Sequence, residues 1–90
     1  MAETTVRIFG LCAERIDLAR RIGEIKNKEN LPIDNPQVEQ DLRRKVIQIC
    51  RKRKMNEEFC LRMLDLLLEE SRRVQRESSK SKQHNDLTKE

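Results

Sequence analysis

Residues 8–26 read IFGLCAERIDLARRIGEIK. At 100° per residue their apolar side chains gather on one side, as expected of a long amphipathic helix. Arg15 and Lys26 lie in the middle of that side. They are almost three turns apart, so their charges stack about 16 Å from each other along the axis, within converging reach of one small ligand. The apolar side consists of Ile8, Leu11, Cys12, Leu18, Ala19 and Ile22.

The flanking residues give the ends of this helix and the start of a second one. The first helix is predicted from about Thr5 to Lys28, with Thr4 or Thr5 near its amino cap. Asn35-Pro36 is a capping side chain followed by proline, which is a strong start for a second helix that reaches about Lys52. The residues between the two helices form a connector.

A third helix is predicted from a cap at Asn56, which two glutamates follow, to about Ser78. Leu66 lies opposite the wide apolar face of this helix, which favours a subunit interface. Residues 79–90 are polar with one isolated leucine, so we expect a disordered tail there. The chain thus divides into a helical domain, residues 1–78, and a tail, residues 79–90.

The composition favours an all-α protein of one domain. Among 90 residues, 40% are charged, two are glycine, two are proline and 2% are aromatic, a profile typical of long helices. A chain of this size is near the lower limit for a stable single core, so oligomerisation would help. No run of about eighteen apolar residues and no secretory leader occurs, so we expect a cytoplasmic protein without membrane contact.

The cysteines and the net charge each have a simple interpretation. Cys12, Cys50 and Cys60 are odd in number, lack the paired spacing of a metal site and fall on apolar faces, which favours buried free thiols. The formal charge of +4 owes much to residues 51–54, a basic run at the expected carboxyl end of the second helix, where cations offset the macrodipole. Without interleaved aromatic residues, this run does not favour nucleic-acid binding.

Three more polar residues fall where the helical pattern expects apolar ones. Glu39 shares the apolar face of the second helix, and Ser71 and Gln75, four residues apart, continue the apolar stripe of the third. A buried unpaired ion costs several kcal/mol, so inward ions need partners. Two inward cations, Arg15 and Lys26, against one inward carboxylate leave a surplus positive charge. A small anion bound inside the helical bundle would balance it.

With these positions placed, the chain resembles the all-helical class of chorismate mutases. Three pieces carry the resemblance. Residues 13–26 are similar to the family's long first helix, residues 31–39 to its loop and second-helix entry, and residues 69–75 to its third-helix signature. The resemblance covers about residues 8–77 without a gap.

The resemblance implies a three-helix protomer that pairs into an intertwined homodimer, with sites inside the helical bundles. It also implies the activity of the family, an isomerase reaction of the shikimate pathway that rearranges chorismate to prephenate for aromatic amino-acid biosynthesis. This reaction is an intramolecular pericyclic shift, so it needs no nucleophile, metal or cofactor. It needs the dianion held compactly and the charge that develops on the ether oxygen stabilised.

The same resemblance implies a role for each inward polar residue. Arg15 would pair with a substrate carboxylate, and Lys26 would donate to the ether oxygen and to a carboxylate. Gln75 would donate to the ether oxygen from the other side. Glu39 would accept from the ring hydroxyl, and Ser71 would give a hydrogen bond to a carboxylate.

Three positions depart from the family pattern. Asn35 stands where the family often has an aspartate near the ring hydroxyl, so it is a secondary binding candidate whose role could be capping alone. Val38 occupies the position of a carboxylate-binding arginine that many members carry just before Glu39. Members also extend the first helix to an arginine that reaches the partner's site, and Met1 falls after that point. The chain thus lacks two arginines that would bind the dianionic substrate. Because each charge-assisted bond is worth about 1.5 to 3 kcal/mol, their absence predicts weak activity.

Each polar residue taken singly also has a structural interpretation. Arg15 could form an interfacial salt bridge, Lys26 could extend to solvent along its aliphatic stem, and Glu39 could serve the positive helix start. Ser71 and Gln75 could be polar spacers. A non-enzymatic helical interaction module, or a degenerate mutase, would explain the high charge and the missing arginines. Neither explains five polar residues at the family's spacing, so the mutase interpretation is preferred.

Overall fold

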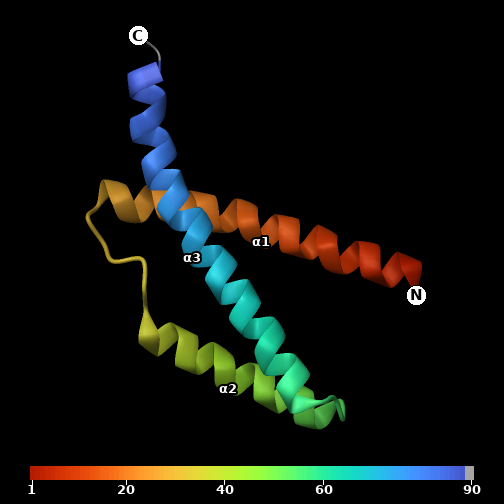
Figure 1. The fold of residues 1–90 in the computed structure, drawn as a ribbon. Helices are drawn as coiled ribbons and strands as arrows, with labels where there is room; N and C mark the ends of the chain where they lie inside the picture. The colour runs from red at the N-terminus through yellow and green to blue at the C-terminus, as the bar shows by residue number, and fades with distance from the viewer. Residues whose placement is uncertain (89–90) are drawn as a thin grey trace. The chain divides into compact units, whose positions relative to one another are not determined.

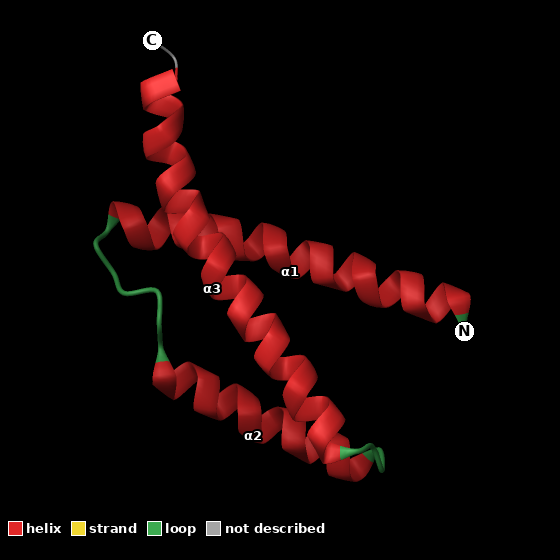
Figure 2. Ribbon diagram, viewed as in Figure 1, coloured by secondary structure: helices red, strands yellow, loops and turns green. Residues whose placement is uncertain are grey.

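The computed structural model describes the backbone of residues 1–88 and the side chains of residues 1–78. It contains three helices: α1 over Ala2–Lys28, α2 over Pro36–Lys52 and α3 over Glu57–Thr88 (Figures 1 and 2). No strand occurs within residues 1–88. The prediction of an all-α chain of three helices is confirmed. None of the helices in this part of the chain is long and apolar enough to cross a membrane.

The start of α1 differs from the prediction. Its first residue is Ala2 and its amino cap is Met1, which forms no side-chain cap bond, so the cap predicted at Thr4 or Thr5 is wrong. The Thr5 hydroxyl donates at 3.1 Å to the Met1 carbonyl oxygen, four residues back, as threonine does within a helix. Because alanine and glutamate favour helix, the residues ahead of Thr4 simply extend it.

The end of α1 at Lys28 agrees with the prediction and leads into an ordered turn. Asn30 has a left-handed conformation with φ 57°, which asparagine tolerates better than most residues. The Leu31 amide then donates to the Lys26 carbonyl oxygen at 2.8 Å. This bond satisfies a carbonyl of the last turn and folds the connector back over the helix end.

Asparagine side chains begin the other two helices, as predicted. Asn35 accepts a hydrogen bond from the Val38 amide at 3.3 Å, and α2 continues to Lys52. Asn56 accepts from the Phe59 amide at 2.8 Å at the start of α3. Each cap satisfies an amide that the first helical turn leaves without a partner.

The third helix extends past Ser78, where the sequence predicts its end, to Thr88. Residues 79–88 include no glycine or proline, so the local sequence contains no strong helix breaker. The side chains of residues 79–88 and the whole of residues 89–90 lie outside the described part of the chain. The predicted disordered tail falls on these residues and stays a prediction.

The chain divides into two compact units, and α3 contributes to both. The first, here called the α1 unit, consists of Met1–Ile33 and Glu70–Glu90. On α1 only two residues are buried in this unit, and both are small: Ala19 and Gly23. On α3 Val74 and Gln75 are buried. The second, the α2 unit, is Asp34–Glu69, a helical hairpin of α2 and the first part of α3 (Figure 1).

The α2 unit has an apolar interior that includes two cysteines. Cys50 and Cys60 are buried and free, as predicted, whereas Cys12 of the α1 unit is only half-buried. Leu64 and Leu68 are buried as well. On the surface of the unit, Arg43 Nη2 and Asp65 Oδ1 form an ion pair at 2.8 Å between the two helices. Burial of apolar surface stabilises the hairpin more than this exposed pair does.

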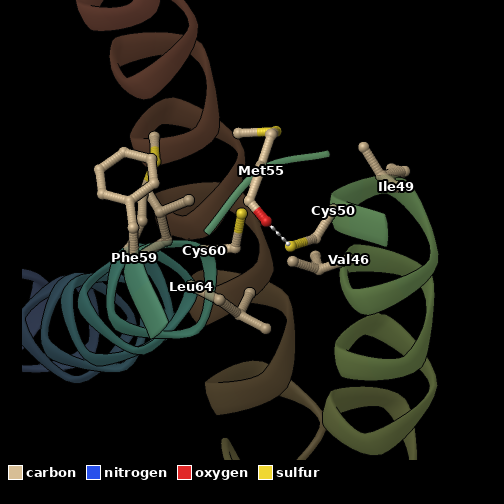
Figure 3. Close-up of a pocket in the computed structure, with 9 residues that line it drawn as sticks. Val46, Ile49, Cys50, Met55, Phe59, Cys60 and Leu64 are labelled. Carbon is tan, nitrogen blue, oxygen red and sulfur yellow. Dashed lines mark hydrogen bonds between the residues drawn. The ribbon is translucent and has the colours of Figure 1, made fainter. Parts of the chain in front are cut away.

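An apolar hollow of about 190 Å³ opens between the two helices of this hairpin (Figure 3). The Cys50 thiol lies at its wall and donates to the Met55 carbonyl oxygen at 3.1 Å. Burial raises the pKa of the Cys50 thiol, and the neighbouring Cys60 thiol raises it further. The hollow is lined by Val46, Ile49, Cys50, Phe59, Cys60 and Leu64, among others.

Most of the apolar side predicted for α1 is not covered by the chain itself. Of its six members only Ala19 is buried, and Leu11 and Leu18 are 64% and 55% exposed. Val6 and Phe9, 70% and 69% exposed, lie nearer the amino end of the helix and outside this side at 100° per residue. Exposed large apolar side chains in this number on one helix are typical of an interaction surface.

Candidate active site

The structure brings Arg15 of α1 and Ser71 of α3 into direct contact. Arg15 Nη1 donates a hydrogen bond to Ser71 Oγ, and both side chains are half-buried. The sequence predicts both residues as inward-facing but does not predict this pair. The bond holds the planar guanidinium in one orientation, and such a group can bind a carboxylate through two parallel N–H donors.

Lys26 lies where α1 meets the connector. Lys26 is half-buried, and its ammonium group donates at 3.1 Å to the carbonyl oxygen of Ile33. An ammonium group has three donors, and this bond uses one. Among the described residues no carboxylate lies within ion-pair distance of Lys26. A half-buried cation without an acidic partner is a favourable place for an anionic ligand.

Gln75 is the buried polar residue of the α1 unit, with 9% of its surface exposed. Its Oε1 is buried and has no hydrogen-bond partner within the described residues. Leaving such a group unsatisfied costs about 1 to 3 kcal/mol, which calls for an explanation. A ligand with polar atoms would supply the missing bond. Rotation of the amide about its last side-chain torsion can present either the oxygen or the nitrogen to it.

Glu39 and Asn35 belong to the α2 unit. Glu39 is half-buried on α2, and Asn35 is exposed with its side-chain oxygen engaged as the cap of that helix. The structure thus brings Arg15, Lys26, Ser71 and Gln75 together in one unit. The participation of Glu39 and Asn35 in the same site stays a prediction.

The apolar hollow of the α2 unit does not have the chemistry of this site. Its lining side chains are aliphatic, aromatic or sulfur-containing, and none is charged. A dianion would lose its hydration there and gain no ionic partner. The polar residues Arg15, Lys26, Ser71 and Gln75, which the sequence predicts as binding residues, lie in the α1 unit.

Residues 2–76 match the family described as chorismate mutase type II. The chain belongs to this family. A chorismate mutase from Methanocaldococcus jannaschii is 28% identical to the chain over 71 residues, covering 79% of the chain and 72% of that relative. A bifunctional chorismate mutase/prephenate dehydratase from Aquifex aeolicus is 48% identical over 42 residues, covering 47% of the chain and 12% of that relative. No solved structure matches the chain at a significant level.

The family membership confirms the resemblance drawn from the sequence. The structure also singles out Gly23, which the sequence places only within the first-helix pattern of residues 13–26. A side-chain Cβ at Gly23 would lie 2.7 Å from the Cα and carbonyl oxygen of Gln75. The available signal was the pair of small residues Ala19 and Gly23, four apart on one helical face.

Proposed function

We propose that this protein rearranges chorismate to prephenate at a site built on Arg15, Lys26 and Gln75. Chorismate mutase activity is the activity of the family to which the chain belongs, so the protein is an isomerase. The sequence pattern predicts these three residues as inward-facing, and their placement in one compact unit supports their assignment. The alternative of a non-enzymatic interaction module is not favoured by the comparisons.

The assignment rests mainly on the incomplete pairing of the polar groups of Lys26 and Gln75. One is a half-buried cation without an acidic partner, and the other is a buried amide with an unsatisfied oxygen. Both conditions cost free energy in the unliganded chain. Negative charge on a ligand relieves the first condition. After rotation of the amide, the Gln75 nitrogen can donate to a ligand oxygen, and chorismate is a dianion with several such oxygens.

These groups suit a reaction that needs electrostatic stabilisation and a compact substrate conformer. Lys26 and Gln75 would donate to the ether oxygen, on which charge develops as the carbon–oxygen bond breaks. Arg15 would bind a carboxylate and, with Ser71 beside it, hold the substrate in the folded conformer that reacts. Glu39, and secondarily Asn35, would accept from the ring hydroxyl. No proton is transferred, so no general base is required.

We also propose that the protein works as an intertwined homodimer in the cytoplasm. The exposed apolar residues of α1 and the apolar hollow of the α2 unit are two surfaces that one copy leaves uncovered. Covering them with a second copy would remove several hundred Å² of apolar surface from water. The three free cysteines agree with a reducing compartment.

The test is the loss of chorismate absorbance on adding the purified protein, with prephenate identified as product. Lys26→Ala and Gln75→Ala should each remove most of the turnover while leaving the circular dichroism spectrum unchanged. Lys28→Ala is the matched control, because Lys28 is an exposed lysine in the last turn of the same helix. Unchanged turnover in both Lys26→Ala and Gln75→Ala would contradict the site, and no turnover in the folded parent protein would contradict the function.

A further inference from the structure

At Gly23, α1 lies so close to the backbone of α3 that a side chain would not fit. A Cβ built on Gly23 would lie 2.7 Å from Gln75 Cα, 2.7 Å from the Gln75 carbonyl oxygen and 3.1 Å from the Gln75 carbonyl carbon. All three atoms are backbone, so no rotamer change at Gln75 could relieve the contact. Ordinary carbon contacts are about 3.5 to 4.0 Å, so any side chain at position 23 would push the helices apart by roughly 1 Å.

The other buried residue of α1 extends this contact. Ala19 is 3% exposed and lies one turn before Gly23 on the same face. On α3 the neighbouring residues Val74 and Gln75 are buried, and the backbone of Gln75 makes the contact with Gly23. Two small residues one turn apart allow two helix backbones to come close together. The spacing of α1 and α3 in this unit therefore depends on the absence of a side chain at position 23.

The approach lies beside the groups assigned to the reaction. Lys26 is three residues after Gly23, one turn along the same face of α1. Gln75 is the residue whose backbone meets Gly23. A change in spacing at position 23 thus changes the position of Gln75 relative to Lys26 directly.

We infer that Gly23 is a positioning residue, which sets the separation of Lys26 and Gln75 through backbone contact with Gln75; the inference rests on the proposed function. Gly23 does not touch the substrate. Because Gly23 has no side chain, Gln75 lies close enough to α1 for Lys26 and Gln75 to donate to the same ether oxygen. A misplacement of about 1 Å can cost about 100-fold in rate.

The test compares Gly23→Ala with Gly10→Ala. Both replace a glycine of α1 by the best helix former, but a Cβ at Gly10 meets no atom within 4 Å. We expect Gly10→Ala to keep the parent kcat and KM. Gly23→Ala should keep its helix content, lose about 100-fold in kcat and change KM much less, because Arg15 lies two turns away from the approach.

A double-mutant cycle separates positioning from a loss of fold stability. Gln75→Ala should remove most of the turnover of the parent protein but little more from Gly23→Ala, since Gln75 is already misplaced there. An equal proportional loss in both backgrounds would overturn the inference, as would full activity of Gly23→Ala beside an active parent. If Gly23→Ala does not fold, the double variant Gly10→Ala/Gly23→Ala offers a more helix-favouring α1, and failure of both to fold would also overturn it. A folded parent without turnover contradicts the proposed function instead.

Discussion

Arg15, Lys26 and Gln75 differ in how completely the chain satisfies them. Arg15 is held by Ser71, whereas Lys26 donates one bond to a backbone oxygen and Gln75 has a buried oxygen without a partner among the described residues. Groups that are preorganised but unsatisfied are those that gain most when a complementary ligand binds. We therefore expect Lys26 and Gln75 to be the catalytic donors, and Arg15 and Ser71 to anchor the substrate.

A prediction at the residue scale concerns the cation that is missing at Val38. This side chain is 57% exposed near the start of α2, so an arginine can be placed there without loss of packing. Val38→Arg should lower KM about tenfold, because one charge-assisted bond to a carboxylate is worth about 1.5 kcal/mol or more. Val38→Gln is the uncharged control. An unchanged or higher KM in steady-state assays of Val38→Arg would show that the carboxylate is bound elsewhere.

Helical periodicity was enough to predict which polar residues avoid solvent, but it did not predict their contacts. Gln75 shares a stripe with buried leucines, and it is buried. The Arg15–Ser71 pair and the approach at Gly23 join residues more than fifty positions apart. They depend on how two helices cross, and the crossing is decided by packing rather than by the pattern of either helix.

At the scale of the helices, local capping explains what the sequence predicted well. Asn35 and Asn56 each accept a bond from an amide three residues later, and both helices begin where these caps place them. The start of α1 was not predicted because Met1 caps it without a side-chain bond. Helix starts with a side-chain cap can be predicted from sequence, whereas those without one depend on weak propensities alone.

The two caps provide a prediction about Asn35, which the resemblance also places near the substrate. Asn35→Ala and Asn56→Ala should each lower the free energy of unfolding by about 1 kcal/mol in urea titrations, because each removes one cap. If Asn35 only caps α2, both variants keep the same kcat. If Asn35 also contacts the ring hydroxyl, only Asn35→Ala loses turnover.

Asn35→Asp preserves the cap and should retain both stability and activity. A loss of stability in that variant would contradict the capping role of this position.

At the scale of the whole molecule, the main question is what covers the apolar surfaces of a 90-residue chain. Within the described residues the buried apolar side chains are few, namely Ala19, Cys50, Cys60, Leu64, Leu68 and Val74. Such an interior is small for a stable domain, while Val6, Phe9 and Leu11 remain more than 60% exposed on one helix. Association would therefore supply a large share of the stability, and folding and dimerisation would be coupled.

Phe9→Glu tests this coupling directly, because Phe9 is 69% exposed in the single chain and does not contribute to its interior. In an isolated monomer the substitution should change stability by less than about 0.5 kcal/mol, as exposed substitutions usually do. In a two-fold dimer it appears twice and buries two carboxylates in an apolar interface, so it should raise the dissociation constant at least 100-fold.

Light scattering after size-exclusion chromatography measures the mass, and Phe9→Leu serves as the apolar control. A Phe9→Glu chain that stays dimeric at micromolar concentration would place the interface away from this end of α1. If it becomes monomeric and inactive with its ligand-binding residues intact, the second copy is needed to complete the active site.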